Sequence, residues 1–446
     1  MIAADALSRR LLELGVKRIW GEALPGSDDR QVPLHVAVRE ADLAVLLADA
    51  DGRIGEVDGR ARLGAALLPG PILHLSSKPG GTAPLQTVGS PEEMLDALVG
   101  PTGVLIPGTM ALHLDFDLHA EVPEDLSAAA QPERQTVLTL DPSMAGLRFA
   151  TVVGPGVVRS AALDGLRSFS RAAGSGVFNT WGAKGVERWD SPWHFGTIGV
   201  QEGDIALAHI HDADVLVVSG LDPDELSAQD IGHPVTQEVH PAQLGALCTR
   251  WETTQDPPSE RPPLYSELSG VLTSAYEDDS APLSAARAAL HLSGALPDGG
   301  MAVVDGGPAG FWVARAFPTS IPNSVVVPAG DPRASAGFAA AAAMICAVEE
   351  RPVLAVTDAA GADTPETAAV LAFAQERGVP VALQVWRDPT QGDTVANWTS
   401  ADQHVRLLEE HLDPEVVRVD DVPVRLGEMA GLVGVAGEPR TGLRAD

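Results

Sequence analysis

RPVLAVTDAAGADTPETAAVLAFAQERGVPVALQVWRD, residues 351–388, decides the fold of this chain. Its apolar runs predict buried strands at residues 352–357 and 379–386, and residues 365–377 between them have the pattern of an amphipathic helix. A strand, a helix and a second strand in this order form a βαβ unit, whose two strands lie parallel in one sheet. The fold class is therefore expected to be α/β.

The same alternation of strand-like and helix-like segments continues over the whole chain. Further strand-like runs lie at residues 17–20, 44–47, 150–153, 215–219, 302–305 and 353–356. Two stretches rich in proline and charge, residues 119–135 and 253–281, are interpreted as linkers. They divide the chain into three domains, residues 1–125, 136–252 and 282–446. Each is expected to hold a parallel sheet flanked by helices, in the manner of a Rossmann fold.

Composition limits the classes of partner. The chain has 446 residues and a net charge of −31, from 61 acidic and 30 basic residues. This charge opposes binding to nucleic acid and to anionic lipid, so we expect neither as a partner. Cys248 and Cys346 lie far apart and have no metal-binding spacing, which fits a reducing cytoplasm.

Two helices are predicted from the spacing of apolar residues. Leu7, Leu11 and Leu14 fall on one helical face near the N-terminus, which indicates a folded helix and not a signal sequence. Residues 337–348, GFAAAAAMICAV, are too few to span a bilayer, which takes about 20 residues. We interpret them as a buried helix that a neighbouring sheet or subunit can approach closely.

A glycine-rich turn, Gly154-Pro155-Gly156, follows the strand at residues 150–153 and precedes a predicted helix at residues 160–173. The backbone N–H groups of such a turn can bind phosphate, so Gly154 and Gly156 are candidate nucleotide-binding residues. The proline and the missing third glycine count against a standard dinucleotide site. We favour a tight turn without ligand, and a nucleotide remains the alternative.

The middle domain has four motifs in order: the glycine turn, a Gly-Lys-Gly-like loop at residues 182–185, a G-x-x-G segment at residues 196–199 and a strand ending at Gly220. With these motifs it resembles the central domain of thiamine-diphosphate enzymes. In most members of that family this domain is a scaffold, and in some it binds FAD or ADP. The resemblance therefore implies a family and leaves FAD or another nucleotide as an open ligand.

The last domain resembles the diphosphate-binding domain of the same family, of the acetohydroxyacid synthase (acetolactate synthase) and 2-oxoacid decarboxylase type. There a V-T-G-D-G motif and a paired Asn hold the Mg²⁺ that carries thiamine diphosphate. Here the corresponding positions read Val356-Thr357-Asp358-Ala359-Ala360-Gly361 and Arg387-Asp388. Mg²⁺ needs octahedral oxygen ligands, which alanine and arginine cannot supply, so we assign no metal ligand and expect the Mg²⁺-thiamine-diphosphate site to be lost.

Asp358, Gly361, Arg387 and Asp388 remain the candidate cofactor-binding residues of this domain. One hypothesis is that Arg387 replaces Mg²⁺ by pairing with a phosphate. The other, which we favour, is that Arg387 pairs with Asp358, Asp363 or Asp388, since carboxylates are plentiful in this chain.

The first domain resembles a shortened pyrimidine-binding domain over residues 4–26 and 38–55. Glu40 is the candidate for the glutamate that activates the cofactor's pyrimidine in this family. The match needs a gap of one residue, because an ungapped comparison places Ala41 at the catalytic position.

The resemblance as a whole implies a homodimer or homotetramer. The degenerate motifs favour a divergent homologue without standard thiamine catalysis, acting as a ligand-binding protein or as a subunit in a complex with another enzyme subunit. The alternative is an active thiamine-diphosphate-dependent carboligase or decarboxylase of 2-oxo acids.

Overall fold

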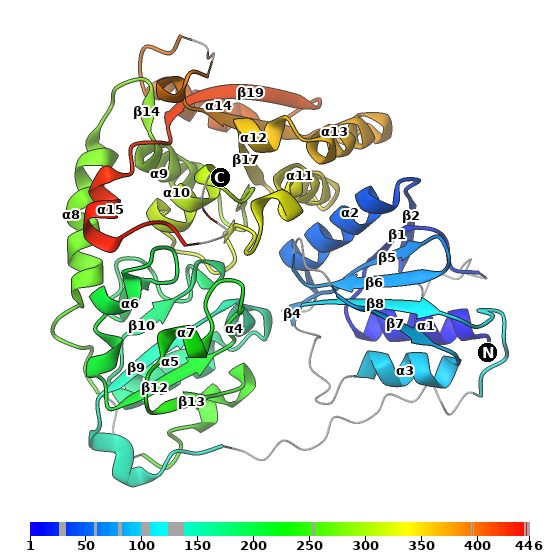
Figure 1. Ribbon diagram of the computed structural model, residues 1–446, viewed down its shortest axis with the longest axis horizontal. Helices are drawn as coiled ribbons and strands as arrows, with labels where there is room; N and C mark the ends of the chain where they lie inside the picture. The colour runs from blue at the N-terminus through cyan, green and yellow to red at the C-terminus, as the bar shows by residue number, and fades with distance from the viewer. Residues whose placement is uncertain are drawn as a thin grey trace. The chain divides into compact units, whose positions relative to one another are not determined.

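A computed structural model gives the structure of the protein over residues 1–25, 33–57, 60–78, 83–99, 108–123, 138–251, 255–393, 395, 397–440 and 443. The chain divides into two compact units, Met1–Thr136 and Val137–Asp446. The second unit contains two sheets, one in the middle segment (residues 138–251) and one in the last segment (residues 255–443) (Figure 1).

The first unit has one six-stranded sheet in the order β2-β1-β5-β6-β8-β7, with helices packed against it. Its elements are α1 (Ala3–Glu13), β1 (Arg18–Gly21), β2 (Leu34–Ala37), α2 (Ala41–Ile54), β3 (Glu56–Val57), β4 (Arg60–Ala61), β5 (Gly64–Leu68), β6 (Ile72–Ser76), β7 (Leu85–Val88), α3 (Pro91–Val99) and β8 (Thr109–Leu114). The predicted N-terminal helix is confirmed as α1, which buries Leu7 and Leu11.

This sheet is mixed, whereas the sequence predicted a purely parallel one. β6 runs antiparallel to both β5 and β8, and the other pairs are parallel. Only Pro69, Gly70 and Pro71 connect β5 to β6. Such a short connection joins antiparallel strands, because a parallel pair needs a crossover of a dozen or more residues.

A second expectation for this unit is also wrong. Residues 44–47, predicted as a strand, lie inside the helix α2. A four-residue apolar run does not distinguish a strand from a buried helix. Here the buried positions extend from Leu43 to Ile54 with few interruptions, so one long helix covers the sheet.

The middle segment forms a five-stranded parallel sheet in the order β11-β10-β9-β12-β13. Its elements are η2 (Pro142–Gly146), β9 (Phe149–Val153), α4 (Pro155–Arg159), α5 (Leu163–Ala173), β10 (Val177–Asn179), η3 (Trp181–Ala183), β11 (His194–Thr197), α6 (Asp204–Leu207), η4 (Ile210–Asp212), β12 (Val215–Ser219), α7 (Ala228–Ile231), β13 (Thr236–Glu238) and η5 (Pro241–Ala246). The predicted strands at residues 150–153 and 215–219 are confirmed as β9 and β12.

The last segment forms a six-stranded parallel sheet in the order β14-β19-β18-β17-β15-β16. Its elements are α8 (Pro263–Glu277), β14 (Leu283–Ser284), α9 (Ala285–Ala295), β15 (Met301–Val304), α10 (Pro308–Ala316), β16 (Val325–Val326), η6 (Pro332–Ser335), α11 (Phe338–Val348), β17 (Val353–Asp358), α12 (Ala359–Ala362), α13 (Pro365–Arg377), β18 (Ala382–Arg387), η7 (Pro389–Gln391), α14 (Asp402–Leu412), β19 (Arg418–Arg425) and α15 (Ala430–Ala436).

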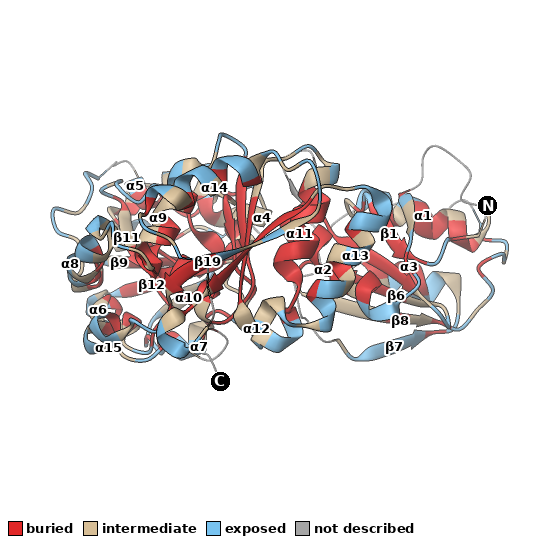
Figure 2. Ribbon diagram, turned by 90° about the horizontal axis from the view of Figure 1, so that it is seen from above, coloured by how far each residue is buried: buried red, intermediate tan, exposed pale blue. Residues whose placement is uncertain are grey.

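The βαβ unit that decides the fold is confirmed as β17, α13 and β18, with β17 and β18 paired in parallel. The alanine-rich segment is α11, buried along nearly its whole length against β15 and β17. In Figure 2, where buried residues are red, the strands of both sheets of this unit and the helix α11 are largely red. The α/β fold class predicted from the sequence is therefore confirmed.

The expected linker at residues 253–281 contains a regular helix, α8. Leu264, Leu268 and Leu272 recur every four residues and are all buried, and Pro263 occupies the first helical position, where proline is tolerated. The abundance of proline, serine and charge hid this pattern. α8 packs against α9, α15 and β11, and Figure 1 shows α15 beside it.

The middle and last segments share one hydrophobic core and form one compact unit. Arg315, at the end of α10, forms a buried ion pair with Asp204 of α6 at 2.6 Å and donates to the carbonyl of Thr197 at 3.1 Å. The C-terminal residues add backbone contacts, such as Gly203 N–H to the Ala436 carbonyl at 2.7 Å. These contacts fix the two sheets of this unit against each other.

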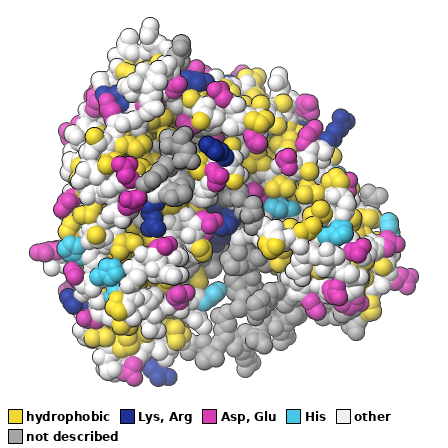
Figure 3. Space-filling view, in the orientation of Figure 1, with side chains coloured by type: hydrophobic (Ala, Val, Ile, Leu, Met, Phe, Trp, Pro, Cys, Tyr) yellow, Lys and Arg dark blue, Asp and Glu magenta, His cyan; other side chains and the backbone are white. Residues whose placement is uncertain are grey.

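Two surface properties follow. In Figure 3, Asp and Glu side chains are distributed over the visible surface of both units, as the net charge of −31 requires. Within the described ranges, no helix combines the length and apolar character that a membrane span needs.

Candidate functional site

A cavity of about 390 Å³ lies where the parallel strands of the last sheet end. Asp305 follows β15, Asp358 is the last residue of β17, and Asp388 follows β18. In open α/β sheets this edge is where ligands bind. We call it the strand-end cavity; its lining consists of Asp305, Gly306, Gly307, Pro308, Asp331, Pro332, Arg333, Ala336, Asp358, Ala359, Ala360, Gly361, Thr364, Trp386, Asp388, Gln391, Asp393, Leu426 and Met429.

The strand-end cavity is strongly acidic. Five of its lining residues carry carboxylates, and Arg333 is the one basic residue among them. The carboxylates are those of Asp305, Asp331, Asp358, Asp388 and Asp393. A cavity with this lining attracts positive charge and repels anions.

The carboxylates accept hydrogen bonds from backbone N–H groups that could otherwise bind a phosphate. Oδ1 of Asp358 accepts from the N–H of Gly361 at 3.0 Å and so caps α12. Oδ1 of Asp305 accepts from the N–H of Ala339, in the first turn of α11, at 2.7 Å. The positive ends of two helices that meet this cavity are thereby neutralised by the protein's own carboxylates.

Arg387 and Asp388, which were compared with an Asn pair in the sequence, lie in different environments. Asp388 lines the cavity and accepts from the N–H of Gly427 at 2.7 Å and of Thr390 at 2.9 Å. Arg387 is not part of the lining, and its Nε donates to Asp421 on the neighbouring strand β19 at 2.6 Å. An aspartate therefore engages Arg387, although Asp421 was not among the aspartates considered from the sequence.

Burial alters the ionisation of two of these carboxyl groups. The pKa of Asp305 is raised to about 6, mainly by burial and to a smaller extent by the charge of Asp358. Burial also raises the pKa of Asp358 above its ordinary value. Asp305 therefore changes its charge within the range of pH in which proteins are commonly handled.

The donor set does not fit Mg²⁺-thiamine diphosphate. Among the described residues no group of three or more His, Cys, Asp or Glu side chains is arranged to hold a metal ion. The oxygens of Asp358 and Asp388 already accept backbone N–H groups, and the methyl groups of Ala359 and Ala360 supply no ligand. A diphosphate here would face five carboxylates and one arginine.

The other residues singled out from the sequence lie elsewhere. Glu40 belongs to the first unit, where it is exposed, immediately precedes α2 and makes no capping hydrogen bond with its side chain. Asp358, Gly361 and Asp388 are the sequence-predicted residues that meet in the strand-end cavity.

The glycine turn of the middle segment is closed by its own hydrogen bonds. Gly154 and Gly156 donate their N–H groups to the carbonyls of Ser219 and Gly220, at 3.0 and 2.8 Å. A Cβ added at Gly154 would lie 2.4 Å from the carbonyl oxygen of Gly220. The glycines allow two chain segments to approach closely, and these N–H groups are not available to a phosphate.

Sequence reasoning missed Asp305, Asp331 and Asp393. Asp305 could have been found by the argument that identified Asp358, because it ends a predicted strand of the same sheet. Asp331 and Asp393 lie in loops, and their approach to the cavity depends on how those loops fold back over the strand ends.

The chain resembles known proteins in one family model and in solved structures. Residues 147–244 match the model of the family described as thiamine pyrophosphate enzyme, central domain. Among solved structures, one similar chain is a Mycobacterium smegmatis protein provisionally classed as a thiamin diphosphate-dependent enzyme. It has a TM-score of 0.62 and 16% identity, over 95% of this chain and 99% of that chain. No curated protein sequence matches.

Proposed function

We propose that this chain is a divergent relative of the thiamine-diphosphate enzymes, without Mg²⁺-thiamine-diphosphate catalysis. The match of residues 147–244 to the family's central domain and the similar fold of a solved chain support the relationship. The role of this chain is to bind a small, positively charged ligand in the strand-end cavity. The observation that carries the proposal is the cavity's lining of five carboxylates against one arginine.

The backbone contacts support the same conclusion. A diphosphate site needs free N–H groups or cations, and here Asp358 and Asp305 already accept the N–H groups of Gly361 and Ala339. A phosphate that took over these N–H groups would leave the buried carboxylates without their hydrogen bonds. Each lost hydrogen bond costs ~1–3 kcal/mol. A cationic ligand keeps the contacts and offsets the negative charge.

Calorimetric titration of the full-length protein tests the proposal. Three probes are compared: thiamine diphosphate with Mg²⁺, thiamine diphosphate with EDTA, and thiamine, which keeps the cationic ring and lacks the diphosphate. We expect thiamine to bind more tightly than its diphosphate, and we expect Mg²⁺ to give no gain. Magnesium-dependent micromolar binding of thiamine diphosphate would overturn the proposal and favour an active carboligase or decarboxylase of 2-oxo acids.

A matched pair of variants assigns the binding to the cavity. Asp358→Asn removes one cavity charge and keeps an oxygen that can accept from Gly361 N–H, and we expect it to weaken thiamine binding. Asp141→Asn is the control, because Asp141 caps η2 in the same way, accepting from Ser143 N–H at 2.8 Å, and does not line the cavity. Equal affinity of the two variants would place thiamine elsewhere.

We further propose that the protein acts within an assembly, as a homo-oligomer or beside another enzyme subunit. The resemblance to the thiamine-diphosphate enzymes supports the proposal, since that family assembles as dimers and tetramers. Sedimentation velocity of the purified chain tests self-association. Co-purification with a full-length family member tests the second arrangement, and a monomer that captures no such member would contradict both.

A further inference from the structure

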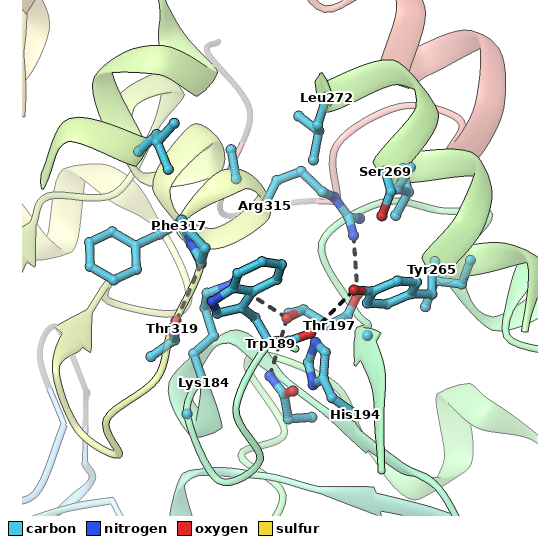
Figure 4. A pocket seen from close by; sticks show the side chains of 18 of the residues that line it. Lys184, Trp189, His194, Thr197, Tyr265, Ser269, Leu272, Arg315, Phe317 and Thr319 are labelled. Carbon is cyan, nitrogen blue, oxygen red and sulfur yellow. Dashed lines mark hydrogen bonds between the residues drawn. The ribbon is translucent and has the colours of Figure 1, made fainter. Parts of the chain in front are cut away.

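A second cavity, of about 420 Å³, lies within the second unit between the middle and last segments. Its walls come from the loop after β10, from β11, from α8 and from the chain after α10 (Figure 4). We call it the intersegment cavity. It does not include the glycine turn at Gly154 or any residue that lines the strand-end cavity.

Lys184 is the unusual residue of this wall. The chain has three lysines, and this one is only 8% exposed. Its Nζ donates to Oγ1 of Thr197 at 3.4 Å, a long hydrogen bond, and no carboxylate of the described residues acts on its ionisation. In Figure 4, Thr197 lies between Lys184 and Arg315. Arg315 is neutralised by Asp204, whereas the charge of Lys184 is not compensated by any carboxylate in the part of the chain that the structure describes.

Other polar atoms of the wall also have unused bonding capacity. Asn179 is fully buried, and its amide nitrogen donates to the Thr180 carbonyl and to Thr197, while its Oδ1 has no partner among the described residues. Within the same part of the chain, Nδ1 of His194 is likewise buried without a partner. Buried polar atoms in folded proteins are nearly always hydrogen-bonded, so these atoms indicate a missing group. An acceptor is missing at Lys184 and a donor at Asn179.

The rest of the wall is apolar. Leu264, Leu268 and Leu272 form one side, on consecutive turns of α8, and Phe317 lies on the segment after α10. Trp189 is 48% exposed and also belongs to the lining. A mainly apolar wall with a few convergent polar atoms is typical of a small-molecule site, and the volume is within the usual range.

We infer that the intersegment cavity binds a small organic acid with a ring and a hydrogen-bond donor. Its carboxylate pairs with Lys184, its hydroxyl or N–H donates to Oδ1 of Asn179, and its ring packs on the leucines of α8. The site is separate from the strand-end cavity, and its ligand has the opposite charge, so the two proposals stand or fall separately.

The ionisation of Lys184 gives the binding a characteristic pH dependence. Burial, and then the charge of Arg315, lowers the pKa of Lys184 to about 7. Burial lowers the pKa of His194 to about 3, so this ring stays neutral. The titratable and charged groups that line the cavity with Lys184 are Glu187 on its own loop, His194 on β11, Tyr265 and Tyr276 on α8, and Arg315 on α10.

A bound carboxylate favours the charged form and therefore raises the pKa of Lys184. Binding then takes up a proton wherever the free amine is neutral. Affinity should be highest below pH 7 and should fall by on the order of tenfold between pH 6.5 and 8.5.

Calorimetric titration of the full-length protein with 4-hydroxyphenylacetate at pH 6.5 and 8.5 tests the inference. The uncharged 4-hydroxyphenylacetamide lacks the carboxylate, and phenylacetate lacks the donor. We expect the acid with the hydroxyl to bind best, phenylacetate more weakly, and the amide not at all. No binding of either acid at millimolar concentration, or equal binding of acid and amide, would overturn the inference.

Two lysine variants complete the test. Lys184→Met removes the charge and keeps an unbranched side chain of similar length. We expect about 10- to 100-fold weaker binding, the range of a charge-assisted hydrogen bond. The remaining binding should not depend on pH. Lys17→Met, at an exposed position in the first unit, should bind as the parent does. Lys184→Met should also melt at a higher temperature, because a buried amine without an anionic partner costs stability. Unchanged affinity in Lys184→Met would contradict the assigned role of Lys184.

Discussion

Buried charged side chains in the second unit differ in how they are compensated. Asp204 and Arg315 neutralise each other, and Asp305 stays buried with a raised pKa. Lys184 has no anionic partner among the residues that the structure describes. A paired charge contributes to the structure as long as its partner is present. An unpaired one lowers stability and marks a place where a ligand or a proton can act.

The pair of Arg315 and Asp204 should be sensitive to the loss of either partner. Arg315→Met leaves the carboxylate of Asp204 buried, and we expect a loss of about 3–5 kcal/mol in the free energy of unfolding. Arg148→Met is the control, because Arg148 pairs with Asp214 at 3.2 Å with side chains 71% and 40% exposed. It should cost less than about 1 kcal/mol. Urea unfolding measures both, and equal losses would show that the buried pair is not important for the fold.

Asp305 should make stability depend on pH. Its pKa is raised to about 6 in the folded protein, and an unfolded aspartate has a pKa of about 3.9. The folded state therefore holds the proton more tightly. The stability that this proton contributes is present below pH ~4 and is lost as pH rises through 6.

Asp305→Asn removes this ionisation and keeps an oxygen that can accept from Ala339 N–H. The free energy of unfolding of the variant, relative to that of the parent, should rise by about 2–3 kcal/mol as pH increases from 4 to 7. Above pH 7 the difference should stay constant. Urea unfolding at intervals of pH measures the difference. A gain that does not vary with pH would contradict the raised pKa.

The helix α8 forms in a segment whose amino-acid composition is typical of a linker. Proline and serine suggested a linker, yet three leucines at four-residue spacing make the helix amphipathic and bury it against β11. Tertiary packing contributes more to a helix than intrinsic propensity does. The same leucines form the apolar wall of the intersegment cavity, so the missed helix also concealed the site.

Two glycines in this unit should respond oppositely to alanine. Gly270 lies exposed in α8, and a Cβ added there would have open space around it. Gly270→Ala should therefore raise the free energy of unfolding of the protein by about 0.5–1 kcal/mol. Gly154→Ala would bring a Cβ to 2.4 Å from the Gly220 carbonyl oxygen and should destabilise by about 1–3 kcal/mol. Thermal unfolding measures both. A stabilised Gly154→Ala would mean that the β9 turn adapts to a side chain.

At the scale of the molecule, the two units have separate cores. Leu7, Leu11 and Leu47 are buried in the first unit, whereas one cluster of the second unit joins residues of the middle and last segments. The last two of the three sequence domains are therefore coupled by shared apolar burial and by Arg315.

A fragment of residues 137–446 should fold alone. It contains both parallel sheets, their common core and the whole lining of both cavities. We expect cooperative thermal unfolding and an affinity for 4-hydroxyphenylacetate within about threefold of the full chain, a free-energy difference of less than ~1 kcal/mol. Circular dichroism and calorimetry measure these properties. A fragment that expresses but lacks cooperative unfolding would show that the second unit needs the first.

The local pattern of the sequence predicted much of the second unit. The strands β9, β12 and β17, the helices α11 and α13, and the parallel pairing of β17 with β18 all follow from apolar runs, helical spacing and the βαβ order. Asp358 and Asp388 were located because strand ends of a parallel sheet meet at one edge.

Tertiary structure alone decided the chemistry of the two cavities. Residues distant in the sequence, such as Asp305 and Asp393, add to one acidic lining, and Arg387 turns to Asp421 on β19. Lys184 is buried in a cavity wall to which α8 and α10 also contribute, without an anionic partner among the described residues. The physical reason is that local spacing determines which face of an element is apolar, whereas burial and charge compensation depend on which elements pack together.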